Sequence, residues 1–382
     1  MTSATSLLRR IAADTALDES RRTLLQERMG PVVARLKRTK SLEFRVVRYF
    51  VHGSTVRGTA VASDVDDLDI IVELEPGPLQ RDGQLLDARL CLKHFHRLLK
   101  LQWRGLLAAR SIRTQLQSHS VGLNWEPRHR IDVVPAVRGT EPGQYLVPEI
   151  ARGAGSMRIP TAWVPTFPEP FNAHMMNLAG AAPDLRDGVR LLKMWKRAIR
   201  ERDATLACVS SYAIEVWCAG KCEIDSKVSV SELIAGFWDH FSRPGVGRIE
   251  GLPAVVDPWT RREIIRPPAG HGPPDPFSAF RKQCALASEA FDSALFSSAS
   301  GDDGLVSAEL AKLFYGRDHE KLVEMRSGRT LRSDPLLPAD EEPYFTAPSA
   351  QDRKEMRRDE EYGEMHPDVW NELWRVDPEL DD

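Results

Sequence analysis

The sequence predicts an α+β protein in which a lobe built on a mixed β-sheet is followed by a helical lobe. Short β-branched and apolar segments typical of strands are concentrated in residues 43–137. From residue 184 onward, apolar residues recur every three or four positions instead, as they do in helices. The chain has 382 residues, enough for about two domains. We expect a first lobe with an N-terminal helix over 1–170, a helical lobe over 171–330 and a tail over 331–382.

Composition excludes several classes of protein. The 42% hydrophobic residues and nine tryptophans exclude a fully disordered chain. No stretch approaches the ~20 apolar residues of a membrane span, and the N-terminus has no hydrophobic stretch of the kind found in signal peptides. Five irregularly spaced cysteines are typical of a reducing compartment. We therefore expect a cytoplasmic protein without a membrane partner.

The net charge of −3 conceals an uneven distribution. Residues 331–382 carry 16 acidic and 6 basic side chains, a net charge of −10, which leaves a net charge of +7 on residues 1–330. A basic body suits a polyanionic ligand such as a nucleoside triphosphate or a nucleic acid. The polar, acidic tail, punctuated by proline, is expected to be disordered or loosely docked.

The elements of the first lobe follow in order along the chain. The first 40 residues have a helical pattern, which Gly30-Pro31 should kink or break. Residues 43–53 alternate β-branched and aromatic side chains and predict a strand. That strand ends at Gly53-Ser54, where we expect a short helix to begin. A second strand is predicted over 67–74, and an amphipathic, Leu-rich helix over 87–109.

The rest of the chain begins with a predicted hairpin and then becomes helical. Residues 113–125 and 129–137 should form the two strands of the hairpin, joined by Glu126-Pro127-Arg128. Residues 138–171, rich in proline and glycine, are expected to be a connector. The predicted helices of the second lobe are Asp184 to Arg202, Cys208 to Lys221, Ser231 to Ser242, Ser278 to Ser297 and Ser307 to Phe314.

Three carboxylates on the predicted strands are candidates for a metal site. The alternation in Asp67-Leu68-Asp69 places both acids on one face of a strand, where they repel each other unless a cation neutralises them. Asp132 lies between Ile131 and Val133 on another strand, where an unpaired buried carboxylate is costly. If the two strands are neighbours, the acids converge. Because no Cys or His accompanies them, Mg²⁺ or Mn²⁺ fits better than zinc.

Gly53 and Ser54 supply a second candidate feature. Glycine permits a tight turn after a strand, and a helix that begins there directs free backbone N–H groups outward. The Ser54 hydroxyl adds a donor for a phosphate oxygen. Asp67 lies thirteen positions after Ser54, which leaves room for a short helix and a return loop.

These features together resemble the nucleotidyltransferase superfamily of DNA polymerase β, whose pattern is hG[GS], then DhDh, then a third acid. The resemblance covers residues 46–135 and is strongest to the CD-NTase family of bacterial cyclic-oligonucleotide synthases, related to the 2′-5′-oligoadenylate synthases. It implies that Asp67, Asp69 and Asp132 are catalytic and bind Mg²⁺ or Mn²⁺. Asp64 and Asp66 offer an alternative acidic pair. We prefer Asp67 and Asp69, because a hydrophobic strand follows them directly.

The helical lobe extends the resemblance. The family has a helix of the form RLLKxW followed by SSY, which implies that Lys193 and Ser211 contact the triphosphate and that Tyr212 stacks on a base. Considered alone, Tyr212 is more often a core residue. For most of the other basic residues of this helix, Arg186, Arg190, Arg197 and Arg200, a solvated face is the better interpretation. LPAVVDPWTR, at 252–261, resembles the family's final strand, which ends in a DP turn.

The resemblance implies an enzyme that joins ribonucleoside triphosphates into a cyclic di- or trinucleotide and releases pyrophosphate. It also implies a role in antiphage signalling, with a regulatory protein or a nucleic acid as activator. Two alternatives remain open. One is a tRNA CCA-adding nucleotidyltransferase, which has a similar core, and the other is a catalytically silent scaffold that binds nucleotides.

Overall fold

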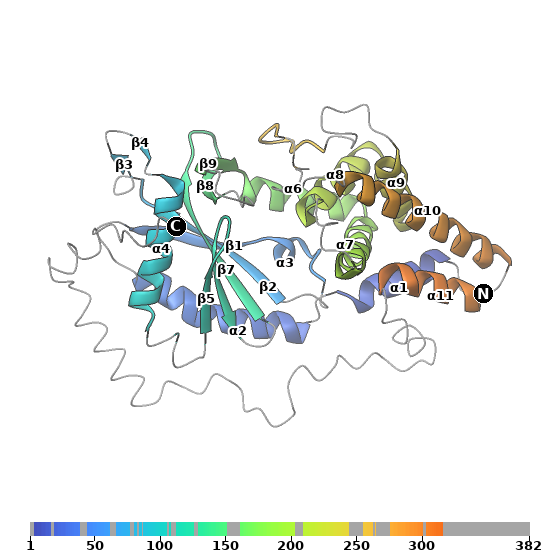
Figure 1. Ribbon diagram of the computed structural model, residues 1–382, viewed down its shortest axis with the longest axis horizontal. Coiled ribbons are helices and arrows are strands. Elements are labelled where there is room, and N and C mark those ends of the chain that lie inside the picture. The colour runs from blue at the N-terminus through green and yellow to red at the C-terminus, as the bar shows by residue number, and fades with distance from the viewer. Residues whose placement is uncertain are drawn as a thin grey trace, which may run out of the picture.

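The computed structural model has a β-sheet flanked by helices on one side and a helical lobe on the other (Figure 1). The structure describes residues 4–16, 19–38, 44–61, 66–76, 80–81, 84–85, 87–104, 107, 112–125, 129–150, 161–202, 209–243, 255–262, 264, 276–300 and 303–315. The predicted acidic tail, Asp64 and Cys208 lie outside these residues.

The central sheet is mixed, as predicted. Its main path has the order β1-β2-β7-β6-β5, and β8 and β9 continue it from β7. Only β2 and β7 pair in parallel among the described strand pairs. The strands are β1 (Val46–His52), β2 (Asp66–Leu74), β5 (Ile112–Leu116), β6 (Val121–Trp125), β7 (His129–Arg138), β8 (Tyr145–Ile150) and β9 (Thr161–Thr166), and a separate pair consists of β3 (Gln80–Arg81) and β4 (Gln84–Leu85).

The alternation in β2 separates a core face from a polar face. Leu68, Ile70 and Val72 are buried in a cluster with residues of α2 (Glu19–Arg38) and α4 (Ala88–Gln102). Asp69 lies on the opposite face, which packs against neither helix. The predicted division of the two faces is therefore confirmed, and burial of the apolar face fixes the register that places Asp69 on the other.

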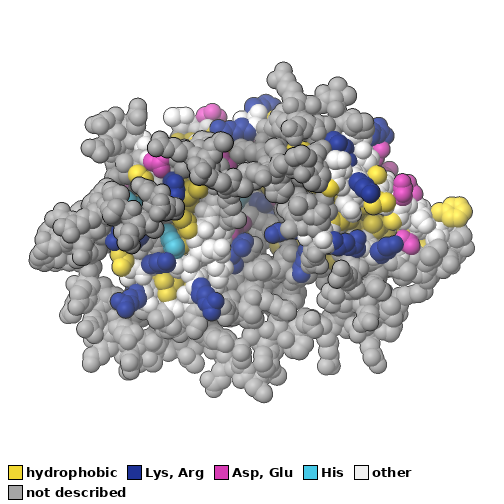
Figure 2. All heavy atoms as spheres, in the orientation of Figure 1, with side chains coloured by type: hydrophobic (Ala, Val, Ile, Leu, Met, Phe, Trp, Pro, Cys, Tyr) yellow, Lys and Arg dark blue, Asp and Glu magenta, His cyan; other side chains and the backbone are white. Residues whose placement is uncertain are grey.

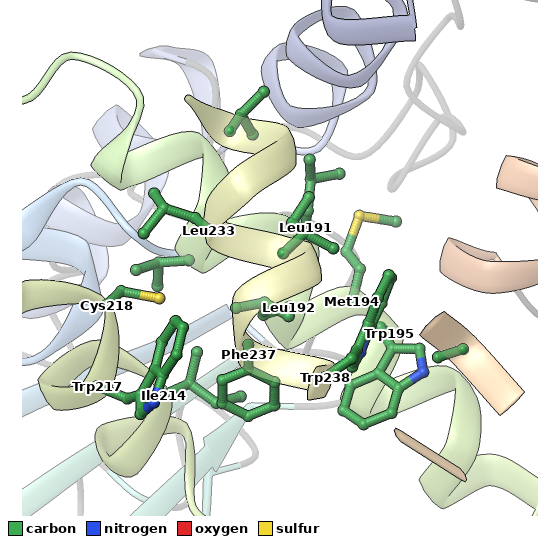
Figure 3. Packing of buried hydrophobic residues seen from close by; sticks show 14 of the residues in the cluster. Leu191, Leu192, Met194, Trp195, Ile214, Trp217, Cys218, Leu233, Phe237 and Trp238 are labelled. Carbon is green, nitrogen blue, oxygen red and sulfur yellow. The ribbon is translucent and has the colours of Figure 1, made fainter. Parts of the chain in front are cut away.

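The helical lobe has its own hydrophobic core. Trp195, Trp217 and Trp238 come from three successive helices and converge with Phe237 (Figure 3). The Trp195 and Trp238 rings lie 5.6 Å apart, centroid to centroid, in an edge-to-face contact. The helices of this lobe are α6 (Pro168–Ala181), α7 (Leu185–Arg202), α8 (Ser211–Ile224), α9 (Val230–Ser242), α10 (Pro276–Ser300) and α11 (Asp303–Phe314).

The N-terminal helix α1 (Ala4–Asp14) packs into the helical lobe, although the sheet follows it in sequence. Its Leu8 and Ile11 are fully buried in the helical core. Arg9 joins it to that lobe through two 3.0 Å hydrogen bonds to the Asp184 carboxylate. The chain therefore starts in the helical lobe and crosses to the sheet with α2.

Three expectations about the elements were wrong. Helix α2 continues through Pro31 without the expected break, with Val32 and Leu36 after it fully buried against the sheet. Tertiary packing of this kind can outweigh the hydrogen bond that proline removes. Residues 113–125 form two strands, β5 and β6, around a turn at 117–120 instead of one.

The expected connector at 138–171 instead contains β8, β9 and the start of α6. Pro148 and Pro165 obscured the strands in the sequence. Pro165 is tolerated because β9 pairs only with β8 in the described sheet, so a missing N–H can face away from the ladder.

The surface in Figure 2 carries Lys and Arg side chains over both halves of the described part of the molecule. No described helix combines the length and the apolar character that a membrane crossing requires.

Candidate active site

Asp69 and Asp132 lie side by side on the two parallel strands. They are register partners between β2 and β7, whose backbones run about 4.8 Å apart. Residues on one face of neighbouring strands at the same register point the same way, so the two carboxylates share one surface of the sheet. Asp67 is two residues earlier on β2, opposite Arg130; the structure describes its backbone only. The sequence left open whether the two acid-bearing strands are neighbours, and the structure shows that they are.

The turn after β1 closes on the Asp69 carboxylate. Gly53 has a φ of 91°, and a Cβ atom there would lie 2.2 Å from Oδ2 of Asp69. Only glycine therefore fits, both for the backbone conformation and for the space. The predicted short helix, α3 (Ser54–Arg57), begins directly after this residue. The acids and the Gly53-Ser54 turn thus form one site.

Two neighbouring side chains hold Asp132. Gln117 Nε2 donates to its Oδ1 at 2.9 Å, and Arg130 Nε lies 3.1 Å from the same oxygen. Gly122 on β6, the register partner of Asp132, makes room for this contact, because a Cβ atom there would come within 2.5 Å of Gln117 Nε2. Burial nevertheless raises the pKa of Asp132 against the lowering effects of Arg130 and Gln117. Gln117 was not identified from the sequence, since only the hairpin at 117–120 brings it here.

The acids have the properties of a cation site. Burial, followed by the negative charge of Asp132, raises the pKa of Asp69 to about 6. Two carboxylates that lose water and face each other are costly until a cation neutralises them. Their oxygens are the ligands that Mg²⁺ or Mn²⁺ prefers. Among the described side chains no group of three such ligands occurs, and of Asp67, the third predicted ligand, the structure describes only the backbone, on the same strand as Asp69. The residues fit the predicted metal.

Helix α7 holds the other end of α3. Arg186 Nε donates to the carbonyl oxygen of Arg57 at 3.2 Å, and Arg190 donates to that of Gly58 at 3.1 and 2.7 Å. Lys193 Nζ donates to the carbonyl of Thr59 at 3.2 Å. One basic residue per turn of α7 thus reaches three successive carbonyls, where a helix end favours cations. This face of α7 is a contact between the lobes, so the interpretation of Arg186 and Arg190 as solvated residues is wrong.

Buried ion pairs complete the contact between the lobes. Glu215 of α8 is 1% exposed and lies 2.6 Å from Arg57 Nη2 and 2.7 Å from Lys193 Nζ. Burial would raise the pKa of Glu215, but the charges of Lys193 and Arg57 lower it to about 2. Glu215 therefore stays ionised between Arg57 and Lys193. The contact between Lys193 and a triphosphate stays a prediction. In the structure its amine donates hydrogen bonds to Glu215 and to the Thr59 carbonyl.

A second lysine of α7, missed in the sequence, lies beside Ser211. Lys196 Nζ donates to the Ser211 hydroxyl at 3.1 Å, and Ser211 is exposed at the start of α8. Lys196 lies one turn beyond Lys193, so the spacing of the basic residues could have indicated it. The pair presents a positive charge and a hydroxyl together, as phosphate binding requires.

Tyr212 is partly buried between the helical lobe and a turn. Its hydroxyl donates to Asp257 Oδ2 at 3.0 Å, and its ring meets Phe171 edge to face at a centroid distance of 4.9 Å. Burial, together with the charge of Asp257, raises its pKa. The expected final strand at 252–261 is described from residue 255 only, and residues 255–262 form a turn closed by a hydrogen bond from Asp257 N to Arg262 O.

His52 has no catalytic character. Burial, followed by the positive charge of Arg57, lowers its pKa to about 3, so it is neutral and a weak base at physiological pH. The four described cysteines (Cys91, Cys218, Cys222 and Cys284) are buried free thiols.

No protein-family profile matches the sequence, and no curated protein is significantly similar to it. Solved structures match most of the chain. The Bradyrhizobium diazoefficiens CD-NTase CdnG, solved with GTP, has a TM-score of 0.62 at 12% identity, over 85% of this chain and 98% of its own. This chain has the CD-NTase fold.

A second structure with this fold is similar over the same extent. Escherichia coli MS115-1 CdnC, solved with ATP, has a TM-score of 0.60 at 18% identity, over 83% of this chain and 98% of its own. CdnC in a complex with a HORMA protein has a TM-score of 0.56 at 17% identity, over 80% of this chain and 95% of its own. The predicted polymerase β-like fold, with a mixed sheet and a helical lobe, is confirmed by these CD-NTase structures. The roles of individual residues and the relation to oligoadenylate synthases stay predictions.

Proposed function

We propose that the chain is a metal-dependent nucleotidyltransferase that joins ribonucleoside triphosphates into a cyclic di- or trinucleotide. The observation that carries the proposal is the register pair of Asp69 and Asp132 on parallel strands, facing the Gly53-Ser54 turn. Two structures with the same fold hold GTP and ATP, which supports nucleotide triphosphates as the substrates.

Each residue of the site has a task in this reaction. Asp67, Asp69 and Asp132 would hold Mg²⁺ or Mn²⁺, and the bound ion would supply the positive charge that lowers the pKa of the attacking ribose hydroxyl and neutralises the phosphates. Ser54, Ser211 and the lysines of α7 grip the triphosphate in line for attack on its α-phosphorus. A new P–O bond forms there and pyrophosphate leaves. The protein contributes mainly position and charge, as in other phosphoryl transfers.

Tyr212 contributes a ring for stacking on a base, which requires only a π-face and so does not select one base. The last transfer within the same pocket, which is the second for a dinucleotide and the third for a trinucleotide, closes the ring of the product. We infer a cytoplasmic antiphage signalling role from the sequence resemblance. A regulatory protein as partner is supported by the CdnC–HORMA complex, and the basic body leaves a nucleic-acid activator as the alternative.

The deciding experiment is incubation with Mg²⁺ or Mn²⁺ and the four ribonucleoside triphosphates, one labelled on the α-phosphate, followed by phosphatase. A cyclic product has no terminal phosphate and keeps its label, whereas unused triphosphate releases it. Phosphatase also removes the terminal phosphates of a linear oligomer, so mass spectrometry separates it from a ring, which keeps one phosphate for each nucleotide. We expect a ring of two or three nucleotides.

Other results would contradict the proposal in distinct ways. Label transferred only to added tRNA, dependent on CTP and ATP, would establish the CCA-adding alternative. Absence of incorporation with either metal, with and without added nucleic acid, would favour the silent scaffold.

Asp64→Asn is the matched control for Asp69→Asn, and it should keep activity, because Asp64 precedes the strand that carries the paired acids.

A further inference from the structure

The Tyr212 ring is held by a hydrogen bond of its hydroxyl and by an aromatic contact, which come from two different segments. The hydroxyl donates to Asp257 Oδ2, and Phe171 of α6 meets the ring edge to face, with an angle of 71° between the ring planes. Tyr212 is the second residue of α8, so its backbone is fixed as well. Rotation about its side-chain bonds would therefore break a hydrogen bond and an aromatic contact together.

Asp257 is itself fixed by the turn around it. Its Oδ1 accepts hydrogen bonds from the backbone N–H groups of Trp259 at 2.9 Å and Thr260 at 3.1 Å, which leaves Oδ2 for the Tyr212 hydroxyl. Its own backbone bonds to both Arg261 and Arg262. The residue is 7% exposed. Each carboxylate oxygen thus has a separate partner, as a buried carboxylate needs.

The same turn also holds the ring that packs on Tyr212. Trp259 meets Phe171 edge to face at a centroid distance of 5.3 Å and an angle of 80°. Tyr212, Asp257, Trp259 and Phe171 therefore form a closed circuit of contacts. A hydrogen bond from a hydroxyl to a carboxylate is among the stronger neutral-to-charged bonds. The raised pKa of Tyr212 keeps this hydroxyl protonated, so it donates at any physiological pH.

We propose that Asp257 is a positioning residue that fixes the plane of the Tyr212 ring, so that the ring is ready to stack on the nucleobase of a bound nucleoside triphosphate. This inference rests on the proposed function, because it needs a base to be bound at Tyr212. A ring fixed in advance loses less conformational entropy when the base arrives, and this raises affinity. This increase in affinity applies to ligands that carry a base and not to the phosphate chain alone.

The test measures binding to the full-length protein by calorimetry, with Mg²⁺ and three ligands: α,β-methylene-ATP, α,β-methylene-GTP and inorganic tripolyphosphate. Tyr212→Phe keeps the ring and the turn but removes the hydrogen bond to Asp257. Asp257→Asn replaces the charged carboxylate that accepts this hydrogen bond with a neutral amide. We expect each to weaken binding of both nucleotides about tenfold, with tripolyphosphate binding unchanged. The double variant should be no weaker than either single variant, since both lose the same interaction. Asp239→Asn, exposed on α9, is the control and should bind like the wild type.

Three outcomes would overturn the inference. A folded Tyr212→Phe that binds the nucleotides as well as the wild type would show that the hydroxyl does not matter. Equal weakening of nucleotide and tripolyphosphate binding would indicate general distortion of the site. Additive losses in the double variant would mean that the two residues act separately. A wild-type protein that binds none of the three ligands would instead contradict the proposed function, and the inference with it.

Discussion

Asp69 is the residue whose charge is most costly in the site. Its pKa of about 6 lies above the ordinary 3.8 because of burial and of the neighbouring Asp132. A carboxyl group whose pKa folding raises stabilises the fold in its protonated form, below about pH 4. This contribution is lost as the pH rises through about 6. At neutral pH the ionised Asp69 therefore lowers the stability of the fold, and its negative charge is available to bind a metal ion.

Asp69→Asn should remove this cost. In EDTA at pH 7 we expect the variant to be more stable than the wild type by on the order of 2 kcal/mol. The difference should shrink as the pH falls from 6 to 4. Thermal unfolding over this range measures it, and Asp292→Asn, exposed on α10, is the control. The same variant should have lost nucleotide incorporation. Incorporation at the wild-type rate with Mg²⁺ would contradict the metal assignment.

The two lysines of α7 should behave differently when replaced. Lys193→Met should lower the free energy of unfolding by on the order of 3 kcal/mol, because Glu215 loses one of two buried partners. Lys196→Met should leave stability within about 0.5 kcal/mol and raise the KM for nucleoside triphosphate. Denaturant unfolding and initial rates measure the two effects. An unchanged KM in Lys196→Met would exclude Lys196 as a phosphate contact, and would leave the predicted contact to Lys193.

At the level of elements, α7 determines where α3 ends. Its basic side chains hold the three carbonyls of residues 57–59, while the Thr59 N–H donates to Ser54 O within the turn at 2.9 Å. The N-terminal end of α3 carries the predicted phosphate-binding residues. Any movement of α7 against the sheet would therefore displace Ser54.

Arg190→Gln should loosen this turn. Arg190 supplies two of the hydrogen bonds from α7 to it, both to Gly58 O. We expect faster amide hydrogen exchange in residues 54–59 and a higher KM for nucleoside triphosphate. The amide exchange rates of α7 itself should not change. Arg200→Gln, exposed near the end of the same helix, should exchange like the wild type. Equal exchange in the two variants would show that α7 does not hold the turn.

The sequence predicted those elements whose pattern is local. The alternation around Asp69 predicted the strand and its two faces, because a period of two is visible in a few residues. Whether Asp132 lies beside Asp69 stayed open, because strand pairing joins residues far apart in the sequence. It did not predict that Gln117 reaches Asp132, because a tight hairpin inside an apparent single strand brings it there. Nor did it predict the partners of Lys193, because Glu215 and Thr59 meet it from other elements.

At the scale of the whole molecule, the two lobes share one buried network. Arg57 is the last residue of α3, which follows β1 of the sheet, and Glu215 belongs to α8. Arg57 Nη2 lies 2.6 Å from a carboxylate oxygen of Glu215, and both side chains are almost fully buried. The division of the chain at residue 170 stays a prediction. The candidate site draws on both sides of that boundary, with the acids on the sheet and Lys196, Ser211 and Tyr212 on the helical lobe. Neither lobe alone carries every group that the proposed reaction needs.

The acidic tail should be dispensable for this reaction. Truncation after Arg332 removes 16 acidic and 5 basic side chains, a net charge of −11, and no predicted site residue. Such a segment repels a triphosphate more readily than it binds one, so we expect the truncated protein to keep its basal incorporation of labelled nucleotide. Thermal unfolding is the control for folding. If a truncated protein that unfolds like the full chain has no activity, the tail belongs to the enzyme, and Trp370 and Trp374 are the residues to replace next.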